Sequence, residues 1–247
     1  MNNIKNIVLQ KNADRYRDGN IVDGYQQEEY HINRIKKGIS MLERLLNNSF
    51  LSIPKNKIRI LDIAGSTGTV AIELQNKGYL AYLSDLDNKA LKTAQDRNSK
   101  LHCIQMDASQ RFPFKDSTFH AIFAGEIIEH LFDSRLFLSE CARCLKNNGV
   151  LVITTPNLAT IQDRILFLFG KSPRQVNPLH EYLYLHIRPF TVSKLKELCK
   201  KTGFTGFSIK TNTVLWRFGK RKIFIPVIGD ILPSIGGSII LGCYLKK

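Results

Sequence analysis

The chain has 247 residues, 43% of them hydrophobic, and its 36 basic and 21 acidic residues give a formal net charge of +15. This length excludes a small disulfide-stapled scaffold and fits one α/β domain with additions, which can bury its own core. The five cysteines form no paired framework and the first residues lack an apolar leader, so we expect a reducing, cytoplasmic compartment.

The positive charge is distributed unevenly along the chain. Residues 1–60 contain eleven basic and six acidic residues, residues 61–157 contain ten and eleven, and residues 158–247 contain fifteen and four. A C-terminal part with a net charge of +11 favours an anionic partner: a phosphorylated or nucleotide-linked sugar, a nucleic acid or a lipid head group. An ordinary solvated surface that keeps the protein soluble explains the same lysines equally well.

The first 54 residues are predicted to form an N-terminal helical cap. Residues 28–46 carry apolar side chains at helical spacing, so one face of this helix should pack on a sheet. Two short charged and aromatic stretches that precede it, residues 14–18 and 23–25, are compatible with closure over a cofactor or with ordinary surface structure.

The next segment has the layout of a cofactor-binding turn. Residues 58–63 predict a buried strand, after which the chain turns through small residues and enters a helix at about Gly68 that ends before Gly78. A second apolar run then leads to Asp85. α/β proteins hold nucleoside-containing cofactors at such a turn, beside a helix N-terminus, and an acid about 20 residues further on binds the ribose hydroxyls.

The acid that ends the first strand indicates which cofactor this turn binds. Asp62 lies inside the turn, where its charge would repel the pyrophosphate of a dinucleotide and attract a cationic amino group. This favours S-adenosylmethionine over a nicotinamide cofactor.

The stretch resembles the first motif of the class I, Rossmann-like S-adenosylmethionine-dependent methyltransferases, Asp-x-Gly-x-Gly-x-Gly. Asp62 and Gly68 match it, whereas Ala64 and Ser66 occupy positions at which the family has glycine. Both replacements are small, but a positive φ at either position would cost energy. The resemblance implies that the cofactor contacts Asp62, Ala64, Gly65, Ser66, Gly68, Asp85, Leu86, Asp107, Ala108 and Glu126.

The following residues extend the resemblance. Residues 102–108 predict a third strand ending in an acid, and residues 111–131 are similar to the Leu-Pro-Phe, Ser-Phe-Asp and Glu-x-x-Glu-His run around the family's fourth strand. Residues 133–145 predict a helix and residues 150–155 a fifth strand. In order and spacing the match covers roughly residues 55–210 and is most similar to the ubiquinone-pathway, type 11 group. It implies a Rossmann-like seven-stranded, mostly parallel sheet with helices on both faces and an antiparallel last strand.

We therefore divide the chain into a helical cap (1–54), an S-adenosylmethionine-binding core (55–157), a substrate lid (158–190) and the C-terminal part of the same sheet domain (191–247). Residues 191–202 predict a helix with a threonine N-cap, ended by Gly203.

The end of the chain contains an apolar stretch, residues 223–245. It holds Asp230, two prolines and a pair of glycines, so it would make a poor membrane-spanning helix. We expect this stretch to form a loop, which starts at residue 223, and then a strand, residues 238–245, that pairs at the sheet edge. Contact with a membrane surface stays open.

Chemistry is expected where the fourth strand ends. Glu126, Glu129 and His130 would share one face if this segment were helical, and His186 of the lid could join them. Such a group suits either a divalent metal, held by Glu126, Glu129, His130 and His186, or acid–base catalysis by His130 and His186 with Glu129. It resembles the magnesium site of small-RNA 2′-O-methyltransferases and the Glu-His motif of quinone-pathway O-methyltransferases. A mainly structural role is the third alternative.

Three functions compete at this stage. The first is S-adenosylmethionine-dependent O-methylation of a small or saccharide-type, anionic or sugar-linked, biosynthetic acceptor. The second is RNA 2′-O-methylation, favoured by the basic C-terminal part but weakened because no RNA-binding appendage is recognisable. The third is a catalytically silent relative that only binds the cofactor. The sequence does not indicate the oligomeric state.

Overall fold

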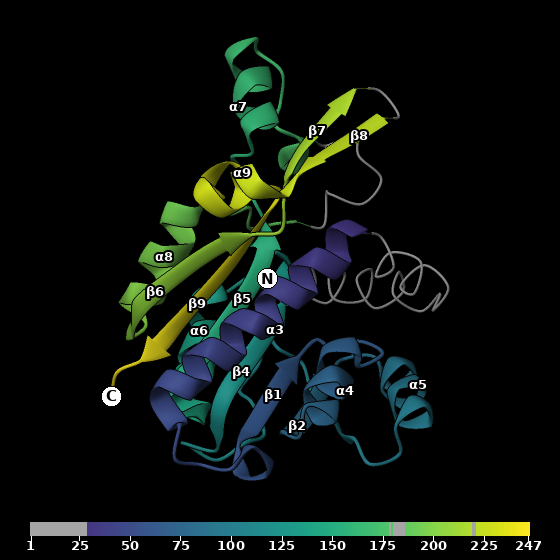
Figure 1. Cartoon of the computed structure of the whole chain (residues 1–247), viewed down its shortest axis with the longest axis vertical. Helices are drawn as coiled ribbons and strands as arrows, with labels where there is room; N and C mark the ends of the chain where they lie inside the picture. Colours follow the sequence, from purple (N-terminus) through teal and green to yellow (C-terminus); the bar gives the residue numbers. More distant parts are fainter. Residues whose placement is uncertain (1–28, 178, 180–185, 219–220) are drawn as a thin grey trace.

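The computed structural model describes residues 29–177, 179, 186–218 and 221–247. Its centre is a seven-stranded sheet in the order β3-β2-β1-β4-β5-β9-β6 (Figure 1). The strands are β1 (Arg59–Ile63), β2 (Leu80–Asp85), β3 (His102–Gln105), β4 (Phe119–Gly125), β5 (Leu145–Pro156), β6 (Phe204–Thr211) and β9 (Ser238–Leu245). β1 to β5 pair in parallel, whereas β9 runs antiparallel to both β5 and β6. The predicted mostly parallel sheet with an antiparallel last strand is confirmed.

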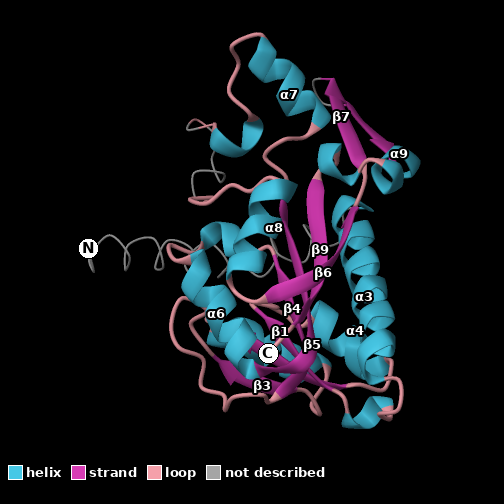
Figure 2. Cartoon of the chain, turned by 90° about the vertical axis from the view of Figure 1, so that its left-hand side faces the viewer, coloured by secondary structure: helices cyan, strands magenta, loops and turns pink. Residues whose placement is uncertain are grey.

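Helices cover both faces of the sheet (Figure 2). One face packs against α3 (Glu29–Phe50), α4 (Thr69–Asn76) and α5 (Asn88–Arg97). The other packs against α6 (Ser134–Cys144) and α8 (Val192–Lys201). Strands buried on both faces read as continuous apolar runs, as β4 and the second half of β5 do.

The N-terminal helix is longer than the apolar spacing predicted. α3 continues through Phe50, and its buried side chains recur every three or four residues along one stripe. Gly38 lies on this stripe, where a Cβ would meet the Phe123 ring at 2.9 Å, so α3 approaches β4 closely. Residues 14–18 and 23–25, and the start of the predicted helix, lie outside the described residues.

The C-terminal part contains one confirmed prediction and two corrections. Thr191 caps α8 by accepting the Lys194 N–H, and Gly203 follows the helix with a φ of 92°. β9 is not an edge strand, because it lies between β5 and β6, and seven of its eight residues are buried.

The second correction concerns the predicted loop that starts at residue 223. It contains the end of a two-stranded hairpin, β7 (Val214–Phe218) and β8 (Arg221–Ile225), then α9 (Pro226–Ile231) and a 3-10 turn. β-Branched and aromatic residues in this stretch explain the hairpin. It lies at the same end of the molecule as α7 (Ile161–Leu168) (Figure 1). Among the helices of the described ranges, none is long and apolar enough to cross a membrane.

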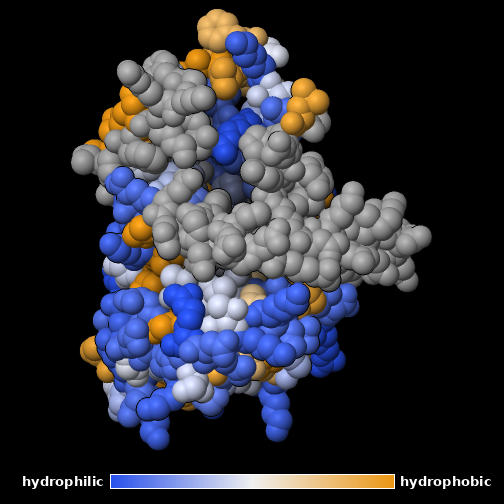
Figure 3. Space-filling model, turned by 90° about the vertical axis from the view of Figure 1, so that its right-hand side faces the viewer, coloured by the Kyte–Doolittle hydropathy of each residue, from blue (hydrophilic) through white to orange (hydrophobic). Residues whose placement is uncertain are grey.

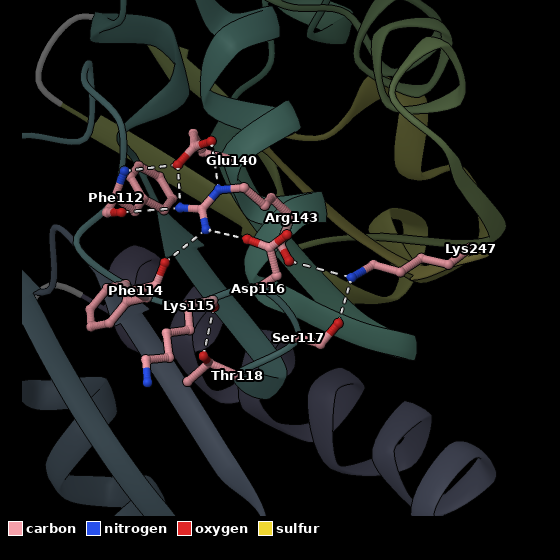
Figure 4. Close-up of polar contacts among 9 residues, drawn as sticks. All are labelled: Phe112, Phe114, Lys115, Asp116, Ser117, Thr118, Glu140, Arg143 and Lys247. Atoms are coloured by element: carbon pink, nitrogen blue, oxygen red, sulfur yellow. Dashed lines mark hydrogen bonds and ion pairs between the residues drawn. The ribbon is translucent and has the colours of Figure 1, made fainter.

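The segment between β3 and β4 is fixed by an arginine of α6 (Figure 4). Arg143 donates to the carbonyls of Phe112 and Phe114 and to Asp116 Oδ1, at 3.0, 2.7 and 2.8 Å. It also donates to both oxygens of Glu140, at 2.9 and 2.6 Å. Glu140 in turn accepts the Phe112 N–H at 2.8 Å. This closed network ties the Phe-Pro-Phe segment to the helix behind it.

Candidate cofactor and acceptor site

The turn after β1 takes three left-handed residues. Ala64, Ser66 and Gly68 have φ values of 56°, 51° and 80°. Glycine adopts this conformation at no steric cost, whereas alanine or serine loses about 1 kcal/mol there. The turn therefore needs a positive φ at both positions at which this chain lacks glycine.

The acid at the end of β1 lies behind the turn and does not face a ligand. Asp62 is 2% exposed, and its Oδ2 accepts the Ala71 N–H of α4 at 3.1 Å. A Cβ on Gly65 would collide with the Asp62 carboxyl, so only glycine lets the turn cover it. Burial raises the pKa of Asp62 to about 8. Asp62 thus lies beneath the turn and binds the start of α4, and its contact with the amino group of the cofactor stays a prediction.

The acid at the end of β2 is better placed for a ligand. Asp85 is partly exposed; its Oδ2 accepts the Ser66 N–H at 2.8 Å and its Oδ1 the Asp87 N–H at 2.9 Å. Each carboxylate oxygen keeps a second lone pair that can accept a ribose hydroxyl. Arg97 of α5 donates to the carbonyl and hydroxyl of Thr67, which holds the turn from the other side.

The remaining predicted cofactor residues lie at the same edge of the sheet. Leu86 follows β2 with an exposed side chain, and its carbonyl accepts from Gln105 at 3.0 Å. Asp107 lies two residues beyond the end of β3 and accepts the Ser109 N–H at 2.8 Å, while Ala108 is buried. The carboxyl ends of parallel strands form the usual ligand crevice of such sheets.

Glu126 differs from the expectation that it shares a helical face with Glu129 and His130. It has a φ of 53°, and only residues 128–130 form a 3-10 turn. Its Oε1 accepts the Thr154 hydroxyl at 3.2 Å and lies 3.6 Å from Nη1 of Arg34. Arg34 Nη1 also donates to Thr154 Oγ1 at 2.7 Å. Glu126 is therefore bound to α3 and β5, apart from the predicted metal group.

The other three predicted residues do come together. One ligand atom each of Glu129, His130 and His186 lies within 4.8 Å of the other two. His130 Nε2 is 3.9 Å from Glu129 Oε1, and the two imidazole rings meet edge to face with centroids 4.9 Å apart. His186 Nδ1 lies 2.8 Å from Gln175 Oε1, which orients its ring.

Glu129 is the most deeply buried member of this group. It is 1% exposed; its Oε2 accepts the Thr155 hydroxyl at 2.9 Å, whereas its Oε1 has no hydrogen-bond partner among the described residues. Burial, and then the charge of Glu126, raise the pKa of Glu129 well above its ordinary value. A carboxyl so placed holds a proton or needs a cation, and a proton on His130 would supply one.

The donor set also fits a divalent metal. Two imidazoles and one carboxylate, with a buried oxygen lacking a partner, suit Mn²⁺, Fe²⁺ or Zn²⁺ better than Mg²⁺, which prefers oxygen ligands. The described residues therefore contain a three-ligand group in place of the predicted four.

Two residues of the site were missed in the sequence. Arg34 interrupts the apolar stripe of α3 with a buried charge, and such a charge at core spacing signals a specific partner. Gln175 follows a proline-containing loop with no periodic signal, so only the structure reveals its contact with His186.

Comparison with known proteins bears on this site. A family model described as a methyltransferase domain matches residues 61–153. These residues include the turn, the acids Asp62 and Asp85, and the Glu129–His130 pair. The chain contains a methyltransferase domain.

Two curated relatives are methyltransferases. A probable S-adenosylmethionine-dependent methyltransferase of Mycobacterium tuberculosis is 29% identical over 120 residues, 49% of this chain and 39% of that protein. A demethylmenaquinone methyltransferase of Thermotoga maritima is 29% identical over 196 residues, 70% of this chain and 85% of that protein. The first relative is named for S-adenosylmethionine and the second for demethylmenaquinone. The chain spans well under half the length of the first of these relatives.

A solved structure is similar in fold over most of the chain. A methyltransferase of Thermotoga maritima, described as a possible histamine N-methyltransferase, superposes with a TM-score of 0.60 at 18% identity and covers 92% of this chain and 96% of that one. His186 and Gln175 lie outside the matched residues 61–153, so the methyltransferase domain meets its additional segments at the candidate acceptor site.

Proposed function

We propose that this chain transfers a methyl group from S-adenosylmethionine to a hydroxyl of a small-molecule acceptor. The turn after β1 carries the proposal: it keeps left-handed residues at all three positions at which the methyltransferase motif has glycines, although two of them are strained alanine and serine residues. Strain of this kind persists where a ligand needs close approach to the backbone.

The group formed by Glu129, His130 and His186 gives the chemistry for the acceptor side. The bound cofactor supplies a methyl group on a positively charged sulfur. A hydroxyl acceptor must lose a proton, and His130 can take it. Glu129 Oε1, 3.9 Å from His130 Nε2, then stabilises the imidazolium, and Gln175 keeps the His186 ring in place beside it. This proton acceptor is our reason for choosing O-methylation.

A metal is the alternative use of the same three side chains. Held by Glu129, His130 and His186, a divalent ion would lower the pKa of a bound hydroxyl. The two alternatives are separable: a chelator leaves acid–base catalysis by His130 unchanged but removes activity that depends on a metal.

The acceptor is proposed from charge and from the relatives. Demethylmenaquinone, named for the Thermotoga maritima relative, is a small molecule, and the +11 of residues 158–247 favours an anionic or sugar-linked compound. The same charge favours RNA as a second acceptor class. A steep loss of activity with rising salt would support RNA, because phosphate contacts release counterions; activity on a neutral small acceptor, insensitive to salt, would exclude it.

Calorimetry with S-adenosylmethionine tests the cofactor site. Replacing Asp85 with alanine should weaken binding by about 1–3 kcal/mol, because the ribose hydroxyls and the Ser66 N–H lose their acceptor. Asp96→Ala, on the exposed face of α5, is the matched control and should bind as the wild type does. Absence of binding heat in the wild type would contradict the proposal, and binding without transfer to any acceptor would identify a catalytically silent relative.

A further inference from the structure

Large apolar side chains are exposed mainly in one part of the molecule. Of fourteen such side chains among the described residues, ten lie between residues 167 and 232, and only four lie elsewhere. The ten are Phe167, Leu168, Phe169, Val176, Leu179, Ile223, Ile225, Ile228, Ile231 and Leu232. Isolated exposed apolar residues are common on soluble proteins, but a concentration of this kind marks an interaction surface.

These side chains belong to neighbouring elements at one end of the fold. α7 contacts β7, and β7 contacts both β8 and α9. Together they form the end of the molecule away from β2 (Figure 1). In the space-filling view hydrophobic surface lies along one side of the upper part, beside hydrophilic side chains, whereas the lower part is mostly hydrophilic (Figure 3). We call residues 161–177, 179, 214–218 and 221–232 the apolar end.

The apolar end is also basic. Its sequence contains six basic residues and two acidic ones, and one of the acids, Asp163, is buried and bonded to Thr160 and to the Arg174 N–H. The basic residues are Arg164, Lys171, Arg174, Arg217, Arg221 and Lys222. By contrast, residues 61–157, which contain the methyltransferase domain, have a net charge of −1.

We propose that the apolar end docks on an anionic lipid bilayer. Exposed apolar side chains can enter the boundary between head groups and acyl chains, while each basic residue near the surface adds attraction to anionic lipids. Leu168 and Phe169, 83% and 76% exposed at the tip of α7, are the principal anchors. Because these side chains project from a helix tip and a hairpin, they suit insertion better than packing on a flat protein surface.

The docked end adjoins the proposed acceptor site. Gln175, which contacts His186, lies in the 3-10 turn between Phe169 and Leu179, within the apolar end. Docking would therefore bring the mouth of the site against the bilayer surface. The docking proposal itself does not depend on the proposed methyl transfer.

Vesicle sedimentation of the full chain tests this proposal without any turnover. The wild type should sediment with phosphatidylcholine vesicles containing about one third phosphatidylglycerol, much less with pure phosphatidylcholine, and less at high salt. Combining Leu168→Ser with Phe169→Ser should lower the apparent affinity for anionic vesicles about tenfold or more.

Matched variants separate docking from general damage. Leu51→Ser combined with Leu136→Ser removes two exposed side chains, 83% and 41% exposed, from outside the apolar end and should leave sedimentation unchanged. Lys171→Gln should weaken sedimentation, whereas Lys92→Gln on α5 should not. Thermal unfolding of each variant should match the wild type, since exposed side chains contribute little to stability.

Two results would overturn the proposal. In the first, the wild type does not sediment with anionic vesicles, or the Leu168 and Phe169 variant sediments equally well. In the second, the wild type ignores vesicles and self-associates in sedimentation velocity, and the same variant abolishes association; a second copy of the chain would then cover the apolar end.

Discussion

Glu129 lies in the 3-10 turn that precedes α6, and Glu140 lies within α6. Both side chains are buried, yet their hydrogen-bond partners differ. Both oxygens of Glu140 are occupied, by two N–H groups of Arg143 and one of Phe112. The Glu129 carboxyl accepts a hydrogen bond from Thr155, and its other oxygen, Oε1, has no hydrogen-bond donor among the described residues. The Arg143 hydrogen bonds lower the pKa of Glu140, whereas burial raises that of Glu129.

The chain thus uses buried glutamates in two ways, to stabilise the fold and to form a functional group. Where the protein supplies the donors, the carboxylate stays charged and stabilises the fold. Where it leaves an oxygen without a donor, the carboxyl takes a proton or a cation from outside, which is the condition for a functional group. The Glu140–Arg143 network is therefore structural, and the group around Glu129 is the candidate catalytic centre.

The largest expected effect is on turnover. Glu129→Gln should lower kcat by about a hundredfold or more, because the imidazolium of His130 loses its counter-charge, with little change in S-adenosylmethionine affinity. Glu197→Gln, which changes an exposed carboxylate on α8, is the control and should retain full turnover. A wild-type kcat in the Glu129 variant would show that Glu129 is structural, as Glu140 is, and that it takes no part in catalysis.

The next effect is on stability. Arg143→Met should lower the free energy of unfolding by about 2 kcal/mol or more, because the Glu140 carboxylate and two carbonyls lose their donors. S-Adenosylmethionine affinity should stay unchanged. Arg135→Met, on the exposed face of the same helix, should unfold like the wild type in urea. Equal unfolding midpoints for the two variants would show that the network contributes nothing.

The two glutamates should also respond oppositely to pH. The lowered pKa of Glu140 contributes stability above the ordinary glutamate pKa, and this stability disappears as the pH falls through the folded value. The raised pKa of Glu129 makes its ionisation increasingly destabilising as the pH rises above the ordinary value. Glu140→Gln should therefore lose stability at neutral pH but not in acid, whereas Glu129→Gln should gain stability relative to the wild type as the pH rises. A loss of stability in Glu129→Gln that appears only when a divalent metal is added would indicate a bound ion.

The smallest effect concerns the strained turn. Ala64→Gly and Ser66→Gly should each raise the free energy of unfolding by up to about 1 kcal/mol, since glycine accepts the left-handed conformation without a steric penalty. Gly68→Ala should instead lower the free energy of unfolding. Gly68 has a φ of 80°, and a Cβ at this position would lie 3.1 Å from the Ala94 Cβ. No gain at either Ala64 or Ser66 would mean that the turn relaxes out of this conformation.

Particular residues show how far the sequence predicts the site. Asp85, Asp107 and Glu126 each follow a strand, so their place at one sheet edge follows from the parallel order of the strands. The roles of Asp62 and Glu126 do not follow from position, because Asp62 is covered by Gly65 and Glu126 binds Arg34 and Thr154. The contacts of Glu126 depend on segments 28 or more residues away, which periodicity does not report.

Motifs, propensities and caps are local properties, so the alternating strand and helix order, the turn after β1 and the capped α8 could be predicted from the sequence. The tertiary structure alone decided that β9 enters the sheet between β5 and β6, that Arg34 reaches Glu126, and that His186 joins Glu129 and His130. These outcomes depend on which distant surfaces exclude water from one another, and the free energy of that burial is a property of the packed chain.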